Sequence, residues 1–254
     1  MLVDAHAHLN DAKYGDDVVG IVNNYRKCGV GLVVNSGFDY KSSVAAKKLA
    51  EEYDDMYFCA GVHPDDAKTV TDGILADLYD LAKDGKCLAI GEIGFDFYWN
   101  KSTEAEQEKA FLSQMKLADE LGLPFVVHSR NAANKTYAFI KEHIALINNG
   151  FLLHCFSESA EMARLFKDLG AYFSFGGVIT FKNAKKDEII RTVGKDRILT
   201  ETDCPYLSPE PFRGQINEPS RIPYILAKMA ESLGLSAEET EKAVESNAKR
   251  FFRL

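Results

Sequence analysis

The chain has 254 residues, of which 46% are hydrophobic and 27% are charged, and its formal net charge at pH 7 is -8. The length fits one barrel-sized domain or two small ones, and the composition excludes a disordered or fibrous chain. The acidic balance argues against a broad basic face that coats duplex DNA, whereas bound divalent ions offset carboxylate charge within a local site.

The apolar runs are all shorter than the roughly 18 residues that a membrane helix needs, so we expect no membrane span. The N-terminus enters a strand-like run directly, and we therefore expect no signal peptide. The cysteines are odd in number and form no Cys-x-x-Cys pair, which predicts buried free thiols in a reducing, cytoplasmic compartment. They are Cys28, Cys59, Cys87, Cys155 and Cys204.

The first ten residues contain the segment Asp4-Ala5-His6-Ala7-His8, which predicts a short buried strand. Side chains two apart on a strand point the same way, so Asp4, His6 and His8 share one face. Such a polar face costs several kcal/mol to bury unless its groups are paired or bind a metal. Two histidines at this spacing predict half of a metal site, and the alternative is a pair of hydrogen-bonded core histidines.

Short apolar runs alternate with longer amphipathic ones along the whole chain. The β-branched and aromatic runs predict strands at 1–8, 30–36, 56–62, 87–92, 124–128, 151–155, 171–175 and 197–202. The amphipathic runs predict helices near 16–28, 41–53, 73–84, 104–121, 133–147, 159–169, 183–193, 219–233 and 237–248. Thr103 and Ser236, each followed by glutamates, are typical of helix starts, and Gly122 and Gly170 of helix ends.

Eight strands with helices between them predict a single-domain (β/α)8 TIM barrel over residues 1–254. A doubly wound open sheet is the alternative. The Gly-x-Gly-x-x-Gly pattern that such a fold places after its first strand is absent from the sequence.

Histidines gather at the predicted strand ends. In a barrel the C-terminal ends of all strands converge on one face, which is where active sites lie. His143 is the exception, and we predict that it is a solvated residue within a helix. The five at strand ends are His6, His8, His63, His128 and His154.

Two carboxylates fall at the same face. Glu92 ends the predicted strand 87–92 and has glycines near it on both sides, which leave space around the carboxylate. Asp203 follows the last predicted strand. Glu201 shares its strand face two residues earlier, either as a partner of a metal ligand or as a paired acid of the barrel interior.

Mixed imidazole and carboxylate ligands suit Zn, Mn, Co or Fe, and tolerate Mg less well. Six candidates are more than one tetrahedral ion needs, which favours two divalent ions that share a bridging carboxylate; the six are His6, His8, Glu92, His128, His154 and Asp203. Glu92 is the predicted bridge, because it is the carboxylate between the two histidine groups in chain order. Asp203 is a weak ligand, the general base that takes a proton from the attacking water, or both.

Several motifs then carry a family resemblance over the whole chain. They are Asp4-Ala-His-Ala-His-Leu9, Gly61-Val-His-Pro64, Gly91-Glu-Ile-Gly-Phe-Asp96, His128-Ser-Arg130, His154-Cys-Phe-Ser157, Glu201-Thr-Asp-Cys-Pro-Tyr-Leu207 and Asn217-Glu-Pro219. In this order and spacing, the chain resembles the TatD family of metal-dependent deoxyribonucleases, one of the amidohydrolase-like barrels.

The resemblance implies hydrolysis of phosphodiester bonds, by a 3′→5′ exonuclease acting on the ends of single-stranded DNA or RNA or by a DNA-repair nuclease. It implies two divalent ions, Zn, Mn or Mg, and a catalytic role for Asp203 and Glu92. His63 takes a position near the metals where it can touch a substrate phosphate; otherwise it is a turn residue bonded to the backbone. The implied metal ligands are His6, His8, Glu92, His128, His154 and Asp203.

Two arginines are predicted to bind substrate. Arg130 can hold a phosphate through two parallel bonds, or it can form an ion pair with a carboxylate such as Asp96. Arg213 is the cation that remains in a loop that is usually more basic in the family, which weakens the expected grip on nucleic acid. The aromatic run 97–99 either stacks on bases or packs under the next helix.

Two other classes of function stay open. One is hydrolysis of C–N bonds or esters in the manner of barrel amidohydrolases, including removal of D-amino acids from tRNA. Those enzymes often use a carbamylated lysine as the bridge, and no lysine occupies a predicted strand end. The other is a non-catalytic barrel, against which the complete ligand set argues. We expect a monomer.

Overall fold

Eight parallel strands form one nearly closed barrel in the computed structural model, which describes residues 1–15 and 17–254. Each strand pairs with the next one along the chain, from β1 to β8. The TIM-barrel prediction is therefore confirmed, with each predicted strand in place. The strands are β1 Leu2–Ala7, β2 Val30–Ser36, β3 Met56–Ala60, β4 Cys87–Asp96, β5 Phe125–Arg130, β6 Phe151–Leu153, β7 Tyr172–Phe175 and β8 Ile198–Thr200.

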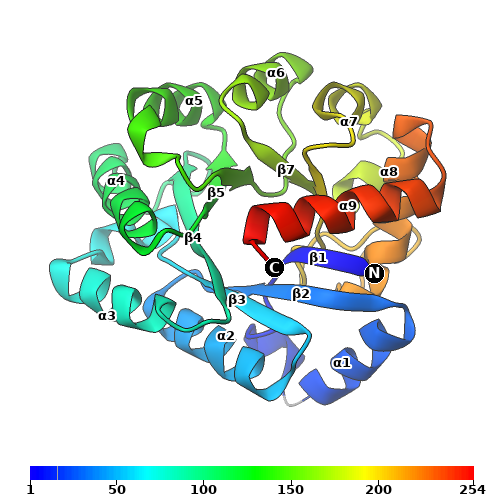
Figure 1. The fold of residues 1–254 in the computed structure, drawn as a ribbon, viewed down its shortest axis with the longest axis horizontal. Helices are drawn as coiled ribbons and strands as arrows, with labels where there is room; N and C mark the ends of the chain where they lie inside the picture. Colours follow the sequence, from blue (N-terminus) through cyan, green and yellow to red (C-terminus); the bar gives the residue numbers. More distant parts are fainter. Residues whose placement is uncertain (16) are drawn as a thin grey trace.

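Helices surround the strands on the outside, as Figure 1 shows, except the last one, which is drawn across one end of the barrel. They are α1 Val18–Lys27, α2 Tyr40–Glu52, α3 Asp72–Ala82, α4 Glu104–Leu121, α5 Ala133–Glu142, α6 Ala160–Asp168, α7 Asp187–Val193, α8 Ile222–Leu233 and α9 Ala237–Phe252. Short 3-10 segments lie at Ala12–Tyr14, Pro64–Thr69, Ile144–Leu146, Gly177–Thr180 and Pro219–Arg221. Helix α9 packs on the first and last strands at their N-terminal end, where the Asn247 amide donates to the Ile198 carbonyl at 2.9 Å.

The predicted helix ends follow from local chemistry. Thr103 and Ser236 each cap a helix in a reciprocal pair with the glutamate three residues later, which satisfies backbone N–H groups that the first turn leaves free. Gly122 ends α4 in the left-handed conformation, with φ 68°, which glycine adopts without strain.

Several predicted bounds need correction. Strand β4 continues to Asp96, because its backbone shifts register between Ile90 and Ile93 and then pairs with β5. Glu92 therefore lies inside the strand and not at its end. The predicted start of the first helix at residue 16 lies outside the described residues. His143 is half-buried at the end of α5, where its Nδ1 lies 2.9 Å from the Phe139 carbonyl, and is not a solvated residue within a helix.

The first and last strands meet through side chains as well as backbone. The Asp203 amide donates to the His6 carbonyl at 3.0 Å. The buried Asp4 carboxylate accepts the Thr202 backbone N–H at 2.9 Å and the Thr202 hydroxyl at 2.5 Å. The Thr202 N–H thus bonds to a side chain and not to a neighbouring strand, and β8 ends before the predicted residue 202. Asp203 consequently lies beside His6 and His8.

Two expectations concern the chain as a whole. The five cysteines are free, and three of them (Cys59, Cys87 and Cys204) are buried, whereas Cys28 is exposed. Among the described residues, no helix has the length and apolar character needed to cross a membrane.

Candidate metal centre

A cavity of about 550 Å³ opens at the C-terminal ends of the strands. It is lined by histidines and by more acidic than basic side chains. Among the described residues, the lining carboxylates are Asp11, Asp65, Asp66, Glu92, Asp96 and Asp203, and the lining cations are Lys101 and Arg130. This face of the barrel is therefore strongly acidic before any cation binds.

His6 of β1 and His8, directly after β1, are fixed from behind by one residue of β2. The ring nitrogen Nδ1 of His8 donates to the Ser36 carbonyl at 2.9 Å, and Nδ1 of His6 lies 3.2 Å from the Ser36 hydroxyl. Both Nε2 atoms consequently face the cavity centre, 3.2 Å apart. Ser36 sets the orientation of both rings.

His128 of β5 is held in the same way, whereas His154, directly after β6, has a carboxylate behind it but no hydrogen bond to it. His128 Nε2 lies 3.0 Å from the Asp96 carboxylate, so that Nδ1 faces inward, 3.2 Å from His154 Nε2. Behind His154, the Glu201 carboxylate lies 3.8 Å from Nδ1 and accepts the Ser174 hydroxyl at 2.5 Å. Glu201 thus stands behind a ring nitrogen of the cluster and does not face the cavity.

Glu92 joins the two histidine pairs. Its Oε1 lies 3.5 Å from His8 Nε2 and 3.6 Å from His6 Nε2. Its Oε2 lies 2.8 Å from His154 Nε2 and 3.2 Å from His128 Nδ1. One oxygen therefore faces each pair, which is the arrangement of a bridging carboxylate.

Asp203 completes the first pair and is the more accessible carboxylate. Its Oδ1 lies 3.4 Å from His8 Nε2 and 4.0 Å from His6 Nε2. Its side chain is 17% exposed, compared with 6% for Glu92. Burial alone would raise the pKa of Asp203, but the hydrogen bond with His8 and the charges of the neighbouring histidines together outweigh burial and hold the pKa below the ordinary value. Asp203 is ionised and open to the cavity.

The donor set fits metal ions. Three overlapping groups bring ligand atoms within 4.8 Å of one another: His6, His8 and Asp203; His6, Glu92 and His154; His63, Glu92 and His128. A neutral His8 with hydrogen on Nδ1 directs an Nε2 lone pair at His6 and Asp203, an arrangement that is repulsive without a cation. In the chain alone a proton fills this role, since contact with Asp203 raises the pKa of His8 to about 9 against the effect of burial. A divalent cation satisfies the same lone pairs without protons.

His63 differs from the other cavity histidines. Its Nδ1 accepts the Asp65 backbone N–H at 3.1 Å, and its Nε2 lies 3.9 Å from Glu92 Oε2. Burial lowers the pKa of His63 to about 3, so the ring is neutral with its hydrogen on Nε2. This side chain presents a hydrogen-bond donor to the cavity. Both predicted features, the backbone bond and the position near the centre, are present.

The two predicted arginines lie in different places. Arg130 lines the cavity, its guanidinium is 4.0 Å from the centre of the Tyr98 ring, and no carboxylate of the described residues pairs with it. Arg213 follows β8, packs over the Phe181 ring at 4.2 Å and lies 3.9 Å from Glu210. Arg213 is not among the residues that line the cavity, and its role toward substrate stays a prediction.

Two supporting residues were not singled out from the sequence. Asp96 is fully buried and holds His128, yet the sequence suggested it only as an ion-pair partner of Arg130. A signal was available, since Asp96 lies four residues after Glu92 and so shares its strand face. Ser36 ends β2, so the strand-end argument applied to histidines would also have found it.

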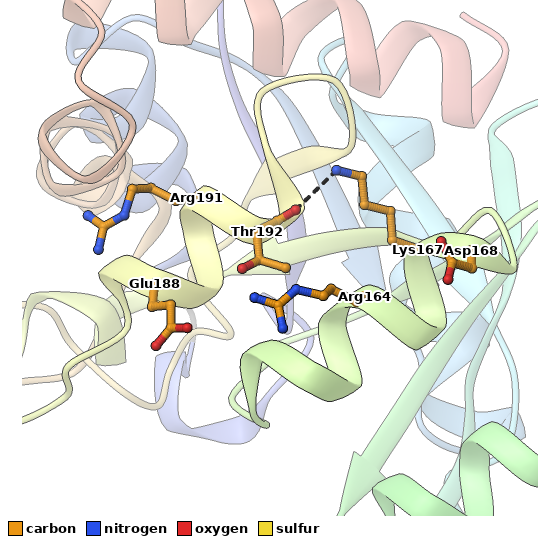
Figure 2. A pocket seen from close by; sticks show the side chains of 6 residues that line it. All are labelled: Arg164, Lys167, Asp168, Glu188, Arg191 and Thr192. Carbon is orange, nitrogen blue, oxygen red and sulfur yellow. Dashed lines mark hydrogen bonds between the residues drawn. The ribbon is translucent and has the colours of Figure 1, made fainter.

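A second hollow, of about 470 Å³, lies outside the barrel between α6 and α7 (Figure 2). Its lining is charged: Arg164, Lys167, Asp168, Glu188, Arg191 and Thr192. The Lys167 ammonium donates to the Thr192 carbonyl at 3.0 Å, which ties the two helices together. This hollow contains no histidine and lies apart from the metal-ligand candidates.

Comparison with known proteins agrees with this geometry. The family model for TatD related DNases matches residues 3–253. The chain belongs to this family. As a TatD-family protein it is a metal-dependent hydrolase.

Relatives and structural neighbours of the TatD-family chain extend over its full length. It is 41% identical to the uncharacterized metal-dependent hydrolase YabD of Bacillus subtilis, over 100% of both chains. It is 31% identical to the 3′-5′ ssDNA/RNA exonuclease TatD of Klebsiella pneumoniae, over 100% of this chain and 98% of that one. The crystal structure of YJJV, a TatD homolog from Escherichia coli, superposes with a TM-score of 0.93 at 27% identity, covering 100% and 98% of the two chains.

Proposed function

We propose that this TatD-family hydrolase is a 3′→5′ exonuclease that hydrolyses phosphodiester bonds at the ends of single-stranded DNA or RNA. One observation supports the proposal above others: the two oxygens of Glu92 face two separate groups of ring nitrogens. Paired divalent ions held by a shared carboxylate suit phosphodiester hydrolysis, in which charge develops on both the attacking and the leaving oxygen.

The ligands divide between two ions. His6, His8 and Asp203 would hold one of them, and His128 and His154 the other, with Glu92 shared by both. When bound, such ions supply Lewis acidity toward the phosphate and lower the pKa of water. They also offset the carboxylates that would otherwise repel a polyanion from this cavity.

The remaining steps belong to the side chains. Asp203 takes the proton from the attacking water on a carboxylate oxygen, for which its ionised state and exposure suit it. His63 donates its Nε2 hydrogen to a non-bridging phosphate oxygen. Arg130 supplies a positive charge to the phosphate from the cavity wall.

The size and charge of the cavity favour a strand end over a long duplex. Its volume is that of a site for a small ligand, and Lys101, one of its two lining cations, is already paired with Asp65 at 2.8 Å. Few phosphates can be neutralised there. A Klebsiella relative carries the name of a 3′-5′ exonuclease for single-stranded DNA and RNA, which supports the same polarity and substrate for this chain.

The test uses purified protein stripped of metal and reloaded with Zn, Mn or Mg in turn. A single strand labelled at its 5′ end should be shortened one nucleotide at a time from its 3′ end, and only in the reloaded protein. A panel of amides and a D-aminoacyl ester of tRNA runs in parallel. Faster hydrolysis of a member of that panel than of the strand, or no cleavage of the strand with any ion, contradicts the proposal.

A further inference from the structure

The turn after β4 places one aromatic ring in the cavity lining, that of Trp99, and a second one, that of Tyr98, directly beside it. Tyr98 and Trp99 are 54% and 56% exposed, and their rings meet edge to face with centres 5.0 Å apart. Phe97, the residue before them, packs instead against the hydrophobic core. The aromatic run 97–99 is therefore divided between packing and exposure. Such exposure of two large rings beside a cavity has no value for folding, since both would be better buried.

The turn is tied directly to the metal-ligand candidates. Asp96 Oδ1 accepts the backbone N–H groups of Tyr98 and Trp99, each at 2.8 Å. Its other oxygen, Oδ2, holds His128 at 3.0 Å. One buried carboxylate thus fixes the aromatic turn and an inward-facing histidine relative to each other, which preorganises the rim with respect to the cavity centre.

A guanidinium and a third aromatic ring complete the rim. The Arg130 guanidinium covers the Tyr98 ring at 4.0 Å and lies 5.6 Å from the Trp99 ring. Tyr206, 45% exposed, lines the same cavity from the segment after β8, and its hydroxyl is held by Asp11 at 2.9 Å. Strands β4 and β8 are four apart in the eight-stranded order, so these two aromatic walls stand on opposite sides of the opening.

We propose that Tyr98 and Trp99 form a stacking shelf for an unpaired nucleobase of the strand whose terminal phosphate lies at the cavity centre. This inference rests on the proposed function and adds to it the element that selects bases. Aromatic faces bind bases of any sequence, and an adjacent guanidinium strengthens such contacts. A paired base has its faces covered by its neighbours in the stack, so the shelf selects single-stranded ends.

The occupant follows from charge. The cavity presents six carboxylates and two cations, so a second phosphate finds little attraction beyond the metal centre and Arg130. A neutral planar base avoids that repulsion while gaining aromatic contact. The shelf therefore contributes binding free energy where the electrostatics of the rim cannot.

Trp99 is the one tryptophan of the sequence, which makes indole fluorescence a direct reporter of the shelf. The titration uses the Asp203→Asn protein with Mg²⁺ or Zn²⁺, so that the strand stays intact. A short thymidine strand should quench the emission, and a strand of the same length with abasic sites at its 3′ end should not. Equal quenching by both strands overturns the proposal.

Kinetics give the second measurement. Trp99→Ala should lower kcat/KM on the thymidine strand by roughly 5- to 100-fold, the range expected for the loss of one base–aromatic stack. On the abasic strand the same substitution should change kcat/KM by less than about twofold, since no base is present to lose. Equal losses of kcat/KM on both strands would show that Trp99 has a structural role and would overturn the proposed stacking shelf.

Two variants control these measurements. Trp99→Phe keeps an aromatic face and should recover most of the activity. Tyr224→Ala removes a ring that is 44% exposed on α8 and does not line the cavity, and it should leave both strands unaffected. If the wild-type protein cleaves neither strand, the proposed function fails, and the fluorescence titration still decides whether the shelf binds a base.

Discussion

The central cavity and the hollow between α6 and α7 have similar volumes, about 550 Å³ and 470 Å³, and opposite chemistry. In the hollow, Arg164 and Arg191 are exposed and lie near Asp168 and Glu188, and Lys167 bonds to a backbone carbonyl. In the cavity, acidic groups predominate, and most of the ring nitrogens and carboxylates are buried.

The difference shows what makes a hollow a site. Positively charged side chains beside a surface depression are common in proteins, and they remain solvated. The cavity instead holds polar groups whose burial costs free energy, and hydrogen-bond partners behind several rings fix their direction: Ser36 for His6 and His8, and Asp96 for His128. Convergent buried groups with fixed directions indicate function more strongly than the sign of the surface charge.

The largest expected effect is loss of the shared carboxylate. Glu92→Gln removes one negative charge and puts an N–H₂ donor against one of the two histidine pairs, where an acceptor is needed. Turnover should fall on the order of 10⁴-fold or more, since the ions contribute several kcal/mol to the barrier. Metal content by elemental analysis should fall with it. If the variant retained its metal and its turnover, Glu92 would not be the bridging carboxylate. The cavity would then no longer differ from the α6–α7 hollow in the way argued above.

Asp203→Asn separates the proton acceptor from the metal centre. We expect a loss of turnover on the order of 10²–10⁴, the usual range for a positioned general base, with the fold and at least one ion retained. Circular dichroism and elemental analysis check the last two points. Near-normal turnover would make Asp203 structural and shift the base to another residue.

Asp96→Asn tests the buried partners that distinguish the cavity. Burial raises the pKa of Asp96, but the hydrogen bond from His128 and the backbone N–H groups of Trp99 and Tyr98 together lower it to about 2, so the wild-type residue carries a negative charge. The amide keeps the size and loses the charge. Metal affinity or activity should fall about 10- to 100-fold, the usual cost of losing a partner behind a ligand histidine. Isothermal titration with Zn²⁺ measures it, and unchanged affinity would count against the orienting role.

The smallest effect comes from a matched pair of arginines. Arg130→Ala should weaken binding of a single strand about tenfold, equally for all sequences, and reduce the slope of log affinity against log salt by about 0.7. Arg191→Ala, in the α6–α7 hollow, should change neither quantity. A salt titration in the Asp203→Asn background compares the two. A slope that indicates six or more phosphates, or an equal effect of both variants, would reveal a basic track outside the cavity.

The fold and the cluster of histidines followed from the sequence because both depend on local patterns. Each strand is a short apolar run, and the strand ends of a barrel must converge, so the order of strands alone brings His6, His128 and His154 together. Period-two alternation likewise directed His6 and His8 to the same side.

What the sequence could not supply is which histidine ring each supporting residue contacts. Ser36 and Asp96 act through contacts between neighbouring strands, whose register shifts by local irregularity in β1–β2 and β4–β5. Such shifts leave no pattern in one chain. The same is true of Arg213, since only the path of the loop after β8 decides that its guanidinium rests on Phe181 and not on the cavity wall.

The seam between β1 and β8 has a consequence for how the protein is made. Asp4 and Thr202 are 198 residues apart in the chain, and the His8 N–H donates to the Cys204 carbonyl at 2.9 Å. The first and the last strand to be synthesised therefore pair with each other only at the end of synthesis. Until β8 has been synthesised, the nascent chain carries His6 and His8 without Asp203. Pairing of the first and last strands then closes a long loop, which costs conformational entropy. An ion held by His6, His8 and Asp203, as proposed above, would link the two strands, and its site would be complete only when the barrel is.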